Sequence, residues 1–368
     1  MTDGERHNVA GTVGSAVLRP FSLAVEWLER VDPGVHRRIK GLRLVTAFAI
    51  ASMLGLMGDI TRGLPDSPTL AFLAGGFALW ASVSEGRDTR AASSRDLLLL
   101  SVAGGVGAAS YVLFTPLLMR IGGVGPELVL ISGAFCVGYL RRFGLAGTGI
   151  GSQIYIGQLL AYSAPLQPYD LPTVGVATVI AAIATIVPRV LSGPAEHAPP
   201  LPMPLPAPAG GLRPELAMGL QAATGALLIV VLNAEIGLTE SAWAITACTY
   251  VIAGSAAGTI DRVWRRIVGT AIGLPLGLAF LPLTATMPVV PWLAAAVAMV
   301  IYAMALPERY DIACGAYAFT LIVTLAATGE HSMAVLVSRG WETLLGGVLG
   351  LAAATLVFPL RSAAPPHS

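Results

Sequence analysis

Long apolar runs alternate with short polar breaks along most of this chain. The runs are rich in Leu, Val, Ala and Gly, and the breaks contain Gly, Pro and charged residues. A bilayer core about 30 Å thick needs about 20 mostly apolar residues per helix. The pattern predicts an all-α polytopic membrane protein with about twelve transmembrane helices. The expected spans are 42–58, 68–83, 97–119, 126–140, 145–164, 172–191, 214–233, 241–258, 267–284, 291–306, 312–328 and 335–360.

Composition supports a membrane protein and excludes several kinds of partner. Hydrophobic residues make up 55% of the chain and charged residues 12%, against about 45–50% and 25% in soluble domains. The basic residues are scattered and the net charge is +1, so the expected partner is the lipid bilayer and not nucleic acid. The widely spaced Cys136, Cys248 and Cys314 lie inside apolar runs, which predicts no disulfide framework, metal site or cofactor.

The distribution of basic residues predicts the orientation in the membrane. Short cytoplasmic loops carry an excess of Arg and Lys. If the loops alternate from a cytoplasmic start, all but three of the 22 basic residues face the cytoplasm, and the exceptions are Arg62, Arg120 and Arg339. An odd number of helices would scramble this bias, so both termini are expected in the cytoplasm. A nearly Lys-free, Arg-rich chain with abundant Ala and Gly suggests a bacterial inner membrane.

The layout of the chain repeats on either side of a Pro-rich stretch. GLMGDI at the end of the first span is matched by VLNAEIG at the end of the seventh, and SEGRDTRAASSRD before the third by GTIDRVWRR before the ninth. We therefore expect two parallel six-helix halves related by an axis along the membrane normal. The N-terminal segment lacks the basic segment, apolar run and small-residue cleavage site of a signal peptide, so the first span is expected to insert uncleaved. The segment after Pro20 predicts either an interfacial helix or a solvated leader. The expected parts are a cytoplasmic N-terminal segment (1–40), the first half (41–191), a cytoplasmic linker (192–213), the second half (214–361) and a cytoplasmic tail (362–368).

One motif, R-x-x-[G/E]-T-x-x-G, occurs twice in the second half. On a helix its Arg, its Gly or Glu, its Thr and its last Gly share one face. Gly350 extends the second stripe, and such stripes of small residues let membrane helices approach closely. The motif residues are Arg266, Gly269, Thr270 and Gly273 in the ninth span, and Arg339, Glu342, Thr343 and Gly346 in the twelfth.

These two segments resemble the fusaric acid resistance (FUSC) family, the aromatic acid exporters. The resemblance covers mainly 212–359, with Glu342 where the family has Asp and with Phe358-Pro359 closing the last helix. It implies efflux of aromatic carboxylic acids driven by the proton gradient. The chain is also similar to the plant aluminium-activated malate transporters, which are anion channels. It looks like a short form, because the bacterial exporters carry a cytoplasmic domain between the halves and this chain has only the linker.

Charged and polar residues inside the spans are the candidates for substrate binding or coupling. Arg339 is expected about 6 Å inside the outer end of its span, where it can bind a carboxylate or pair with Glu342 as a neutral structural unit. The polar run in the fifth span either lines a cavity or makes helix-to-helix hydrogen bonds. The candidates are Arg339, Glu342, Thr343, Arg266, Thr270, Gln153, Tyr155, Gln158 and Tyr162. Near the outer surface, Glu127, Glu235, Glu240, Glu330 and His331 are expected to be solvated loop residues, with a role in proton transfer as the less favoured alternative.

Several functions remain open at this point. We expect a transporter, with proton-coupled efflux of small organic, in particular aromatic, carboxylic acids as the leading hypothesis. A passive organic-anion channel is the main alternative, and a membrane subunit without transport is another. An enzyme is not expected, because the sequence contains no nucleophile elbow or phosphate-cradling loop. The major facilitator fold lacks support, because its signature loop is absent. The sequence does not specify a periplasmic partner or a homo-oligomer.

Overall fold

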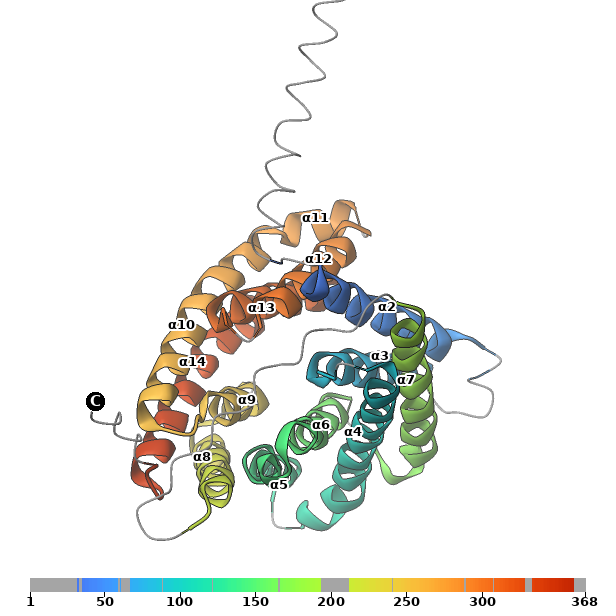
Figure 1. Ribbon diagram of the computed structural model, residues 1–368. Coiled ribbons are helices and arrows are strands. Elements are labelled where there is room, and N and C mark those ends of the chain that lie inside the picture. Colours follow the sequence, from blue (N-terminus) through green and yellow to red (C-terminus); the bar gives the residue numbers. More distant parts are fainter. Residues whose placement is uncertain are drawn as a thin grey trace, which may run out of the picture.

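The computed structural model describes most of both halves. It covers residues 32, 35–58, 60, 67–87, 89–120, 122–164, 166–192, 212–239, 241–287, 289–306, 308–327 and 333–360. The possible interfacial helix, most of the linker and the C-terminal tail lie outside these residues. Within them, the chain forms helices joined by short turns (Figure 1).

Each predicted span of the first half contains a helix. The first helix starts at His36, inside the segment that the sequence assigned to the N-terminal region. The elements are α2 (His36–Leu56), α3 (Ser67–Ser84), α4 (Arg90–Leu118), α5 (Gly125–Tyr139), η1 (Leu140–Phe143), α6 (Gly144–Ser163), η2 (Pro168–Asp170) and α7 (Leu171–Leu191).

The second half contains a helix in each predicted span and one extra short helix. The elements are α8 (Pro214–Ile236), α9 (Ser241–Val251), α10 (Ala256–Ala279), α11 (Leu281–Thr286), α12 (Val289–Ala305), α13 (Tyr310–Ala327) and α14 (Met333–Leu356). The boundaries differ most from expectation between α9 and α10. The helix α9 ends at Val251, seven residues before the expected end of its span, and α10 begins eleven residues earlier than expected.

Local signals explain where several helices begin and end. The Thr89 hydroxyl accepts a hydrogen bond from the Ala92 backbone N–H at 3.3 Å at the start of α4, and Ser255 does the same for Gly258 at 3.1 Å in α10. Such N-caps satisfy backbone N–H groups that the helix leaves unpaired. At the other end of α8, Gly237 adopts φ +66°, a left-handed conformation that favours glycine.

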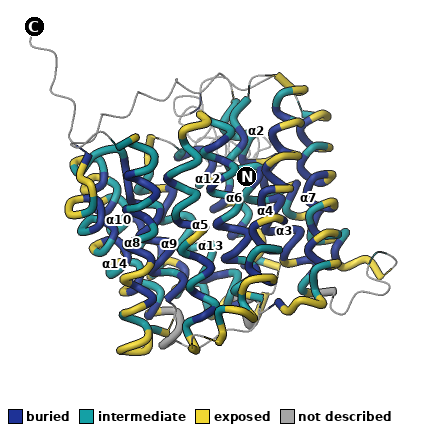
Figure 2. Tube along the Cα trace, turned by 90° about the horizontal axis from the view of Figure 1, so that it is seen from below, coloured by how far each residue is buried: buried dark blue, intermediate teal, exposed yellow. Residues whose placement is uncertain are grey.

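The helices have the length and composition of a membrane protein. Figure 2 shows them side by side, with buried residues facing inward and exposed residues at the ends and periphery. In the described ranges, six helical segments are long and apolar enough to cross a membrane, and three shorter helical stretches are also apolar. The chain is thus an all-helical membrane protein, whereas the total of twelve spans stays a prediction.

The helix neighbours of the two halves correspond. In the first half α6 packs against α4 and α5, and α7 packs against α3. In the second half α13 packs against α10 and α12, and α14 packs against α9. The halves meet at two equivalent places, α5 with α8 and α2 with α12, and α3, α6, α9 and α13 surround the centre (Figure 1). These contacts are the ones that two related halves would make.

The two halves share a hydrophobic core. One buried cluster combines Leu130 and Tyr155 of the first half with Met218 and Ile245 of the second. A Cβ built on Gly138 of α5 would overlap the backbone of α8, so glycine is what lets these helices touch. The contact between α2 and α12 is also hydrophobic, because buried apolar side chains of these two helices pack against each other.

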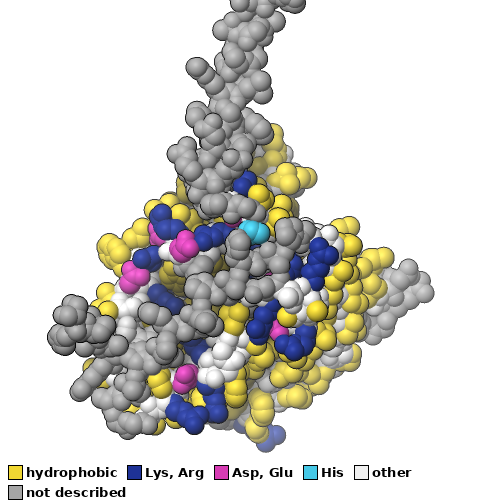
Figure 3. Space-filling view, in the orientation of Figure 1, with side chains coloured by type: hydrophobic (Ala, Val, Ile, Leu, Met, Phe, Trp, Pro, Cys, Tyr) yellow, Lys and Arg dark blue, Asp and Glu magenta, His cyan; other side chains and the backbone are white. Residues whose placement is uncertain are grey.

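Basic side chains gather at one end of the helices, which we call the basic end. Figure 3 looks onto this end and shows Lys and Arg side chains surrounded by hydrophobic ones. Here Arg37 Nη2 lies 2.7 Å from Glu308 Oε1. This hydrogen bond and the charge of Arg37 lower the pKa of Glu308. The contact joins α2 to the turn after α12, so it links the two halves at their exposed surface.

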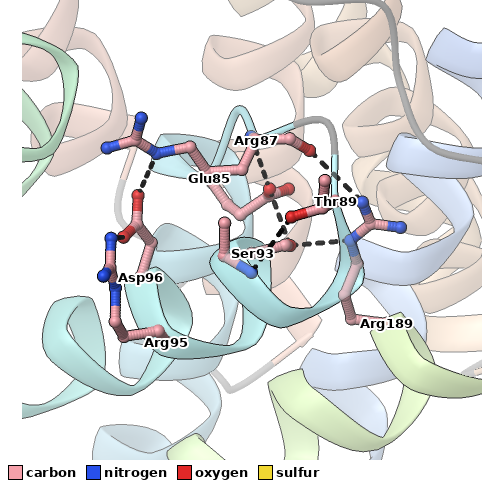
Figure 4. Close-up of polar contacts among 8 residues, drawn as sticks. Glu85, Arg87, Thr89, Ser93, Arg95, Asp96 and Arg189 are labelled. Carbon is pink, nitrogen blue, oxygen red and sulfur yellow. Dashed lines mark hydrogen bonds and ion pairs between the residues drawn. The ribbon is translucent and has the colours of Figure 1, made fainter.

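A buried polar network fixes the turn between α3 and α4 at the basic end (Figure 4). Arg189 Nε of α7 donates to Ser93 Oγ at 2.6 Å, and Ser93 Oγ donates to Glu85 Oε1 at 2.7 Å. Arg87 Nε lies 2.6 Å from Asp96 Oδ2. Glu85, Ser93 and Arg189 are all buried, so the network holds α3, α4 and α7 together as one rigid unit.

Candidate functional site

Aromatic side chains from both halves meet in the centre of the molecule. The ring of Tyr317 (α13) lies 5.5 Å from Trp80 (α3), 6.2 Å from Trp243 (α9) and 6.2 Å from Tyr302 (α12), measured between ring centroids. Trp80 and Tyr302 also meet edge to face at 6.1 Å. All four are only partly buried. We call these four residues the aromatic cluster. Its rings can add a further ring in the edge-on or offset geometry that aromatic pairs prefer.

Two arginines lie next to the aromatic cluster. The Arg339 guanidinium (α14) sits 4.8 Å from the centroid of the Trp243 ring, within the range of a cation–π interaction. Arg266 Nη1 (α10) donates to the Tyr310 hydroxyl at 3.2 Å, and its Nε has no hydrogen-bond partner among the described residues. Both guanidinium groups act electrostatically on Tyr317. The cluster therefore lies in the field of two positive charges.

The helix α10 places Arg266 deeper than the sequence suggested. Because α10 starts at Ala256, Arg266 lies about 15 Å along the helix. The other motif side chains lie near it or near Arg339. Glu342 is fully buried, and the Thr343 hydroxyl donates to the Arg339 carbonyl oxygen of its own helix at 2.7 Å. Thr270 is half-buried on α10.

The motif glycines bring the arginine-bearing helices against the aromatic ones. A Cβ built on Gly273 would overlap the carbonyl oxygen of Gly315 in α13, and one built on Gly346 would overlap the carbonyl oxygen of Ala244 in α9. The other two motif glycines, Gly269 and Gly350, have equally close neighbours in α13 and α9. Close approach of these backbones puts Arg266 and Arg339 within reach of the cluster.

A cavity of about 210 Å³ lies between the halves at the basic end. The α9–α10 junction borders it, because Thr249 and Tyr250 are in the last turn of α9 and Ile252 follows in non-helical backbone. Irregular backbone at membrane depth is tolerated where it lines a cavity. Its lining residues are Ser84, Val137, Arg141, Leu145, Thr148, Gly149, Ser152, Thr249, Tyr250, Ile252 and Arg262.

The mouth of this cavity is positively charged. Arg141, after α5, and Arg262, in the second turn of α10, both line the cavity and repel each other electrostatically. Arg262 Nη1 donates to the Ile252 carbonyl oxygen at 3.4 Å, which satisfies part of the interrupted backbone. Two neighbouring cations in a partly enclosed site attract anions. The cavity therefore suits a small anion approaching from the basic end.

The predicted polar run of α6 makes hydrogen bonds between helices. Gln153, Tyr155 and Gln158 are buried. Gln153 Nε2 donates to Ser84 Oγ at 3.2 Å, the Tyr155 hydroxyl lies 2.8 Å from Thr246 Oγ1, and Gln158 Nε2 donates to Ser110 at 3.1 Å and Ser132 at 3.0 Å. Among the α6 residues that line the cavity is Ser152, whose hydroxyl lies 2.7 Å from that of Tyr250. Sequence reasoning missed it because serine is common in membrane helices.

A buried carboxylate at the opposite end was also missed. Glu127 in the first turn of α5 is 5% exposed, so the expectation that it is solvated is wrong. Asn233 Nδ2 donates to its two oxygens at 2.8 and 3.0 Å, and the hydroxyls of Ser241 and Tyr162 donate to Oε1. Glu235 is exposed as expected. The remaining outer acids and His331 lie outside the described residues.

Comparison with known families gives one match, in the second half of the chain. Residues 225–353 match the family model described as fusaric acid resistance protein-like. This part of the chain is similar to that family. The region holds Arg266, Arg339, Trp243, Tyr302 and Tyr317, whereas Trp80 and one wall of the cavity come from the half outside it. No curated protein and no solved structure matches the chain. The family match and the apolar helices fit a membrane transporter.

The described residues contain no group of three His, Cys, Asp or Glu side chains arranged to hold a metal ion.

Proposed function

We propose that the protein exports small aromatic carboxylic acids across a bacterial inner membrane, driven by the proton gradient. The observation that supports this most is the aromatic cluster in the field of Arg266 and Arg339 at the junction of the halves. An arginine can bind a carboxylate through two parallel hydrogen bonds, while indole and phenol rings pack against an aromatic ring. The cluster offers both kinds of contact within one site.

The size of the cavity supports a small substrate. Pockets for drug-sized ligands measure roughly 300–1,000 Å³, whereas the cavity at the basic end is about 210 Å³. A single-ring acid fits this volume better than a large multi-ring compound. Its carboxylate would first meet Arg141 and Arg262 and then move along α10 toward Arg266.

The proposed topology makes the basic end cytoplasmic. Twelve spans in two parallel halves, with both termini inside, place Arg141 and Arg262 on the cytoplasmic side. The cavity would then be the cytoplasmic vestibule of a carrier whose halves rock against each other at the α5–α8 and α2–α12 contacts. Glu342, fully buried one turn after Arg339, is a candidate to compete with the substrate carboxylate for that arginine.

A passive anion channel is the second candidate. It is favoured by the succession of cations from Arg141 and Arg262 at the cavity to Arg266 deeper in α10, because a row of positive charges can conduct anions. A channel needs no titrating group and lets the anion move down its own gradient. A membrane subunit without transport would show neither property.

Transport in proteoliposomes separates these functions. Purified protein is reconstituted and the movement of radiolabelled benzoate is followed under an imposed pH gradient. An exporter accumulates benzoate against its concentration gradient and prefers it to cyclohexanecarboxylate, which lacks the aromatic ring, and to benzyl alcohol, which lacks the charge. Movement that ignores the pH gradient favours the channel. An absence of any benzoate movement contradicts the proposal.

Matched variants test the proposed binding site. Arg266→Gln and Arg339→Gln each remove one charge beside the cluster and are expected to lower the apparent benzoate affinity about tenfold, since a hydrogen bond to a charged group contributes about 1.5–3 kcal/mol. Arg120→Gln is the control, because Arg120 is exposed after α4. Equal affinity in all three variants would show that the substrate binds elsewhere.

A further inference from the structure

Glu127 joins the two halves at the end of the molecule opposite the cavity. Glu127 and Tyr162 belong to the first half, whereas Asn233 (α8) and Ser241 (α9) belong to the second. Glu127 and Ser241 are buried. Asn233 is held in place in turn, because its Oδ1 accepts from the Leu238 backbone N–H at 2.6 Å. Any motion that separates α5 from α8 and α9 must break these hydrogen bonds.

The donors to Glu127 within the described part of the chain are all neutral. On the helices packed against α5, the nearby titratable side chains are Tyr162 of α6 and Tyr111 of α4, whose rings meet edge to face at 6.2 Å. Glu235 of α8 and Arg120 after α4 are both exposed, and Glu240, just before α9, lies outside the described residues. Among the described residues, no cation forms an ion pair with Glu127. Protonation of Glu127 would therefore leave no described cation without its ion-pair partner.

The carboxylate is coupled mechanically to the cavity through α6. Tyr162 and Ser152 lie ten residues apart on α6, about 15 Å along its axis, and Ser152 contacts Tyr250 at the cavity. Glycines pack α6 tightly against its neighbours, because a Cβ on Gly157 would overlap α4 and one on Gly151 would overlap α5. A helix held in this way moves as a rigid body, so a shift at Glu127 is passed on to the cavity.

We propose that Glu127 is the proton-binding group of the transport cycle and that its charge controls closure of the outer junction between the halves. This inference rests on the proposed function. Burying a charged carboxylate is costly, so the neutral acid favours the closed outer junction. A proton taken up from the outside returns the carrier to its inward-facing state. Release of that proton to the cytoplasmic side, through the cavity at the basic end, leaves Glu127 charged and allows the outer junction to open again. In this scheme Glu342 competes with the substrate carboxylate for Arg339 and does not carry the transported proton.

Transport assays distinguish coupling from substrate movement. Glu127→Gln carries a permanently neutral side chain of nearly the same shape. We expect it to lose pH-driven accumulation about tenfold, and to slow but not abolish benzoate exchange between equal concentrations on the two sides, because the neutral side chain favours the closed outer junction. Glu127→Asp should recover part of the accumulation, and Glu235→Gln, which changes an exposed acid at the same end, should behave like wild type. Full accumulation by Glu127→Gln, or loss of coupling only in Glu342→Gln, overturns the assignment.

A spectroscopic test does not depend on transport. Infrared difference spectra of the purified protein are recorded between alkaline and acidic buffer. The assignment expects a band from a protonated buried carboxylic acid in wild type and in Glu235→Gln, and its loss in Glu127→Gln. An unchanged band in Glu127→Gln contradicts the assignment. If wild type moves no benzoate at all, the export proposal fails on its own, while this measurement still decides whether Glu127 binds the proton.

Discussion

At the scale of single residues, Tyr317 is the best test of aromatic recognition, because its ring contacts Trp80, Trp243 and Tyr302. We expect Tyr317→Leu to reduce the preference for benzoate over cyclohexanecarboxylate by about two- to tenfold, since an aromatic pair contributes about 0.5–1.5 kcal/mol beyond buried area. The measurement is the ratio of the two transport efficiencies in proteoliposomes.

The control for Tyr317 is an aromatic pair outside the cluster. Phe280 and Phe319 meet edge to face at 5.2 Å between ring centroids, also between α10 and α13. Phe280→Leu removes a ring of similar size and should leave the substrate preference unchanged. A similar drop in preference for both variants would point to general loosening of α13, which contradicts a direct role of Tyr317.

Single residues also show what the sequence could and could not reveal. Arg339 stood out because charge inside an apolar run is rare, and Arg266 because it opens the repeated motif. Glu127 did not, because its partners Asn233 and Ser241 are 106 and 114 residues away in the chain. The sequence does not distinguish a carboxylate in a solvated loop from a buried one, because the buried environment forms only when the second half packs against the first. The place of Trp80 in the aromatic cluster was not predicted for the same reason.

At the scale of elements, the contact between α10 and α13 depends on Gly273. We expect Gly273→Leu to destabilise the protein by about 1–3 kcal/mol, because overpacking a tight contact forces backbones apart. The readout is the apparent melting temperature in detergent, followed by tryptophan fluorescence. The control is Gly175→Leu in α7, where a Cβ would meet nothing within 4 Å. This change should shift the apparent melting temperature little. Equal shifts in both variants would refute the close packing of α10 on α13.

The positions of the helices follow from hydropathy, but the break between α9 and α10 does not. Apolar runs long enough for a membrane span predicted the four helices that carry the aromatic cluster, α3, α9, α12 and α13. The junction is residues 252–255, and its first two, Ile252 and Ala253, are apolar and buried, so a hydropathy average continues the span through them. Side chains of α10 stabilise the interrupted backbone: Arg262 donates to the Ile252 carbonyl, and the Thr259 hydroxyl accepts from the Ala253 N–H at 3.1 Å.

At the scale of the whole molecule, the halves meet where α5 packs against α8 and where α2 packs against α12. The cavity borders α5 at the basic end, whereas Glu127 and its neutral donors join the halves at the opposite end. In the proposed carrier these two ends would open in turn, as alternating access requires. The function therefore depends on which side of the membrane the basic end faces.

Cysteine labelling determines that orientation. Arg142→Cys in the turn before α6 and Glu235→Cys at the end of α8 are both exposed sites, introduced singly after Cys136, Cys248 and Cys314 are replaced. Between them lie α6, α7 and α8, so the two sites face opposite sides of the membrane if each helix crosses once. We expect a membrane-impermeant maleimide to label Glu235→Cys in intact cells and Arg142→Cys only after the cells are opened, because basic loops stay in the cytoplasm. The reverse result would invert the proposed direction of transport, and labelling of both sites from outside would mean that one of the three helices does not cross.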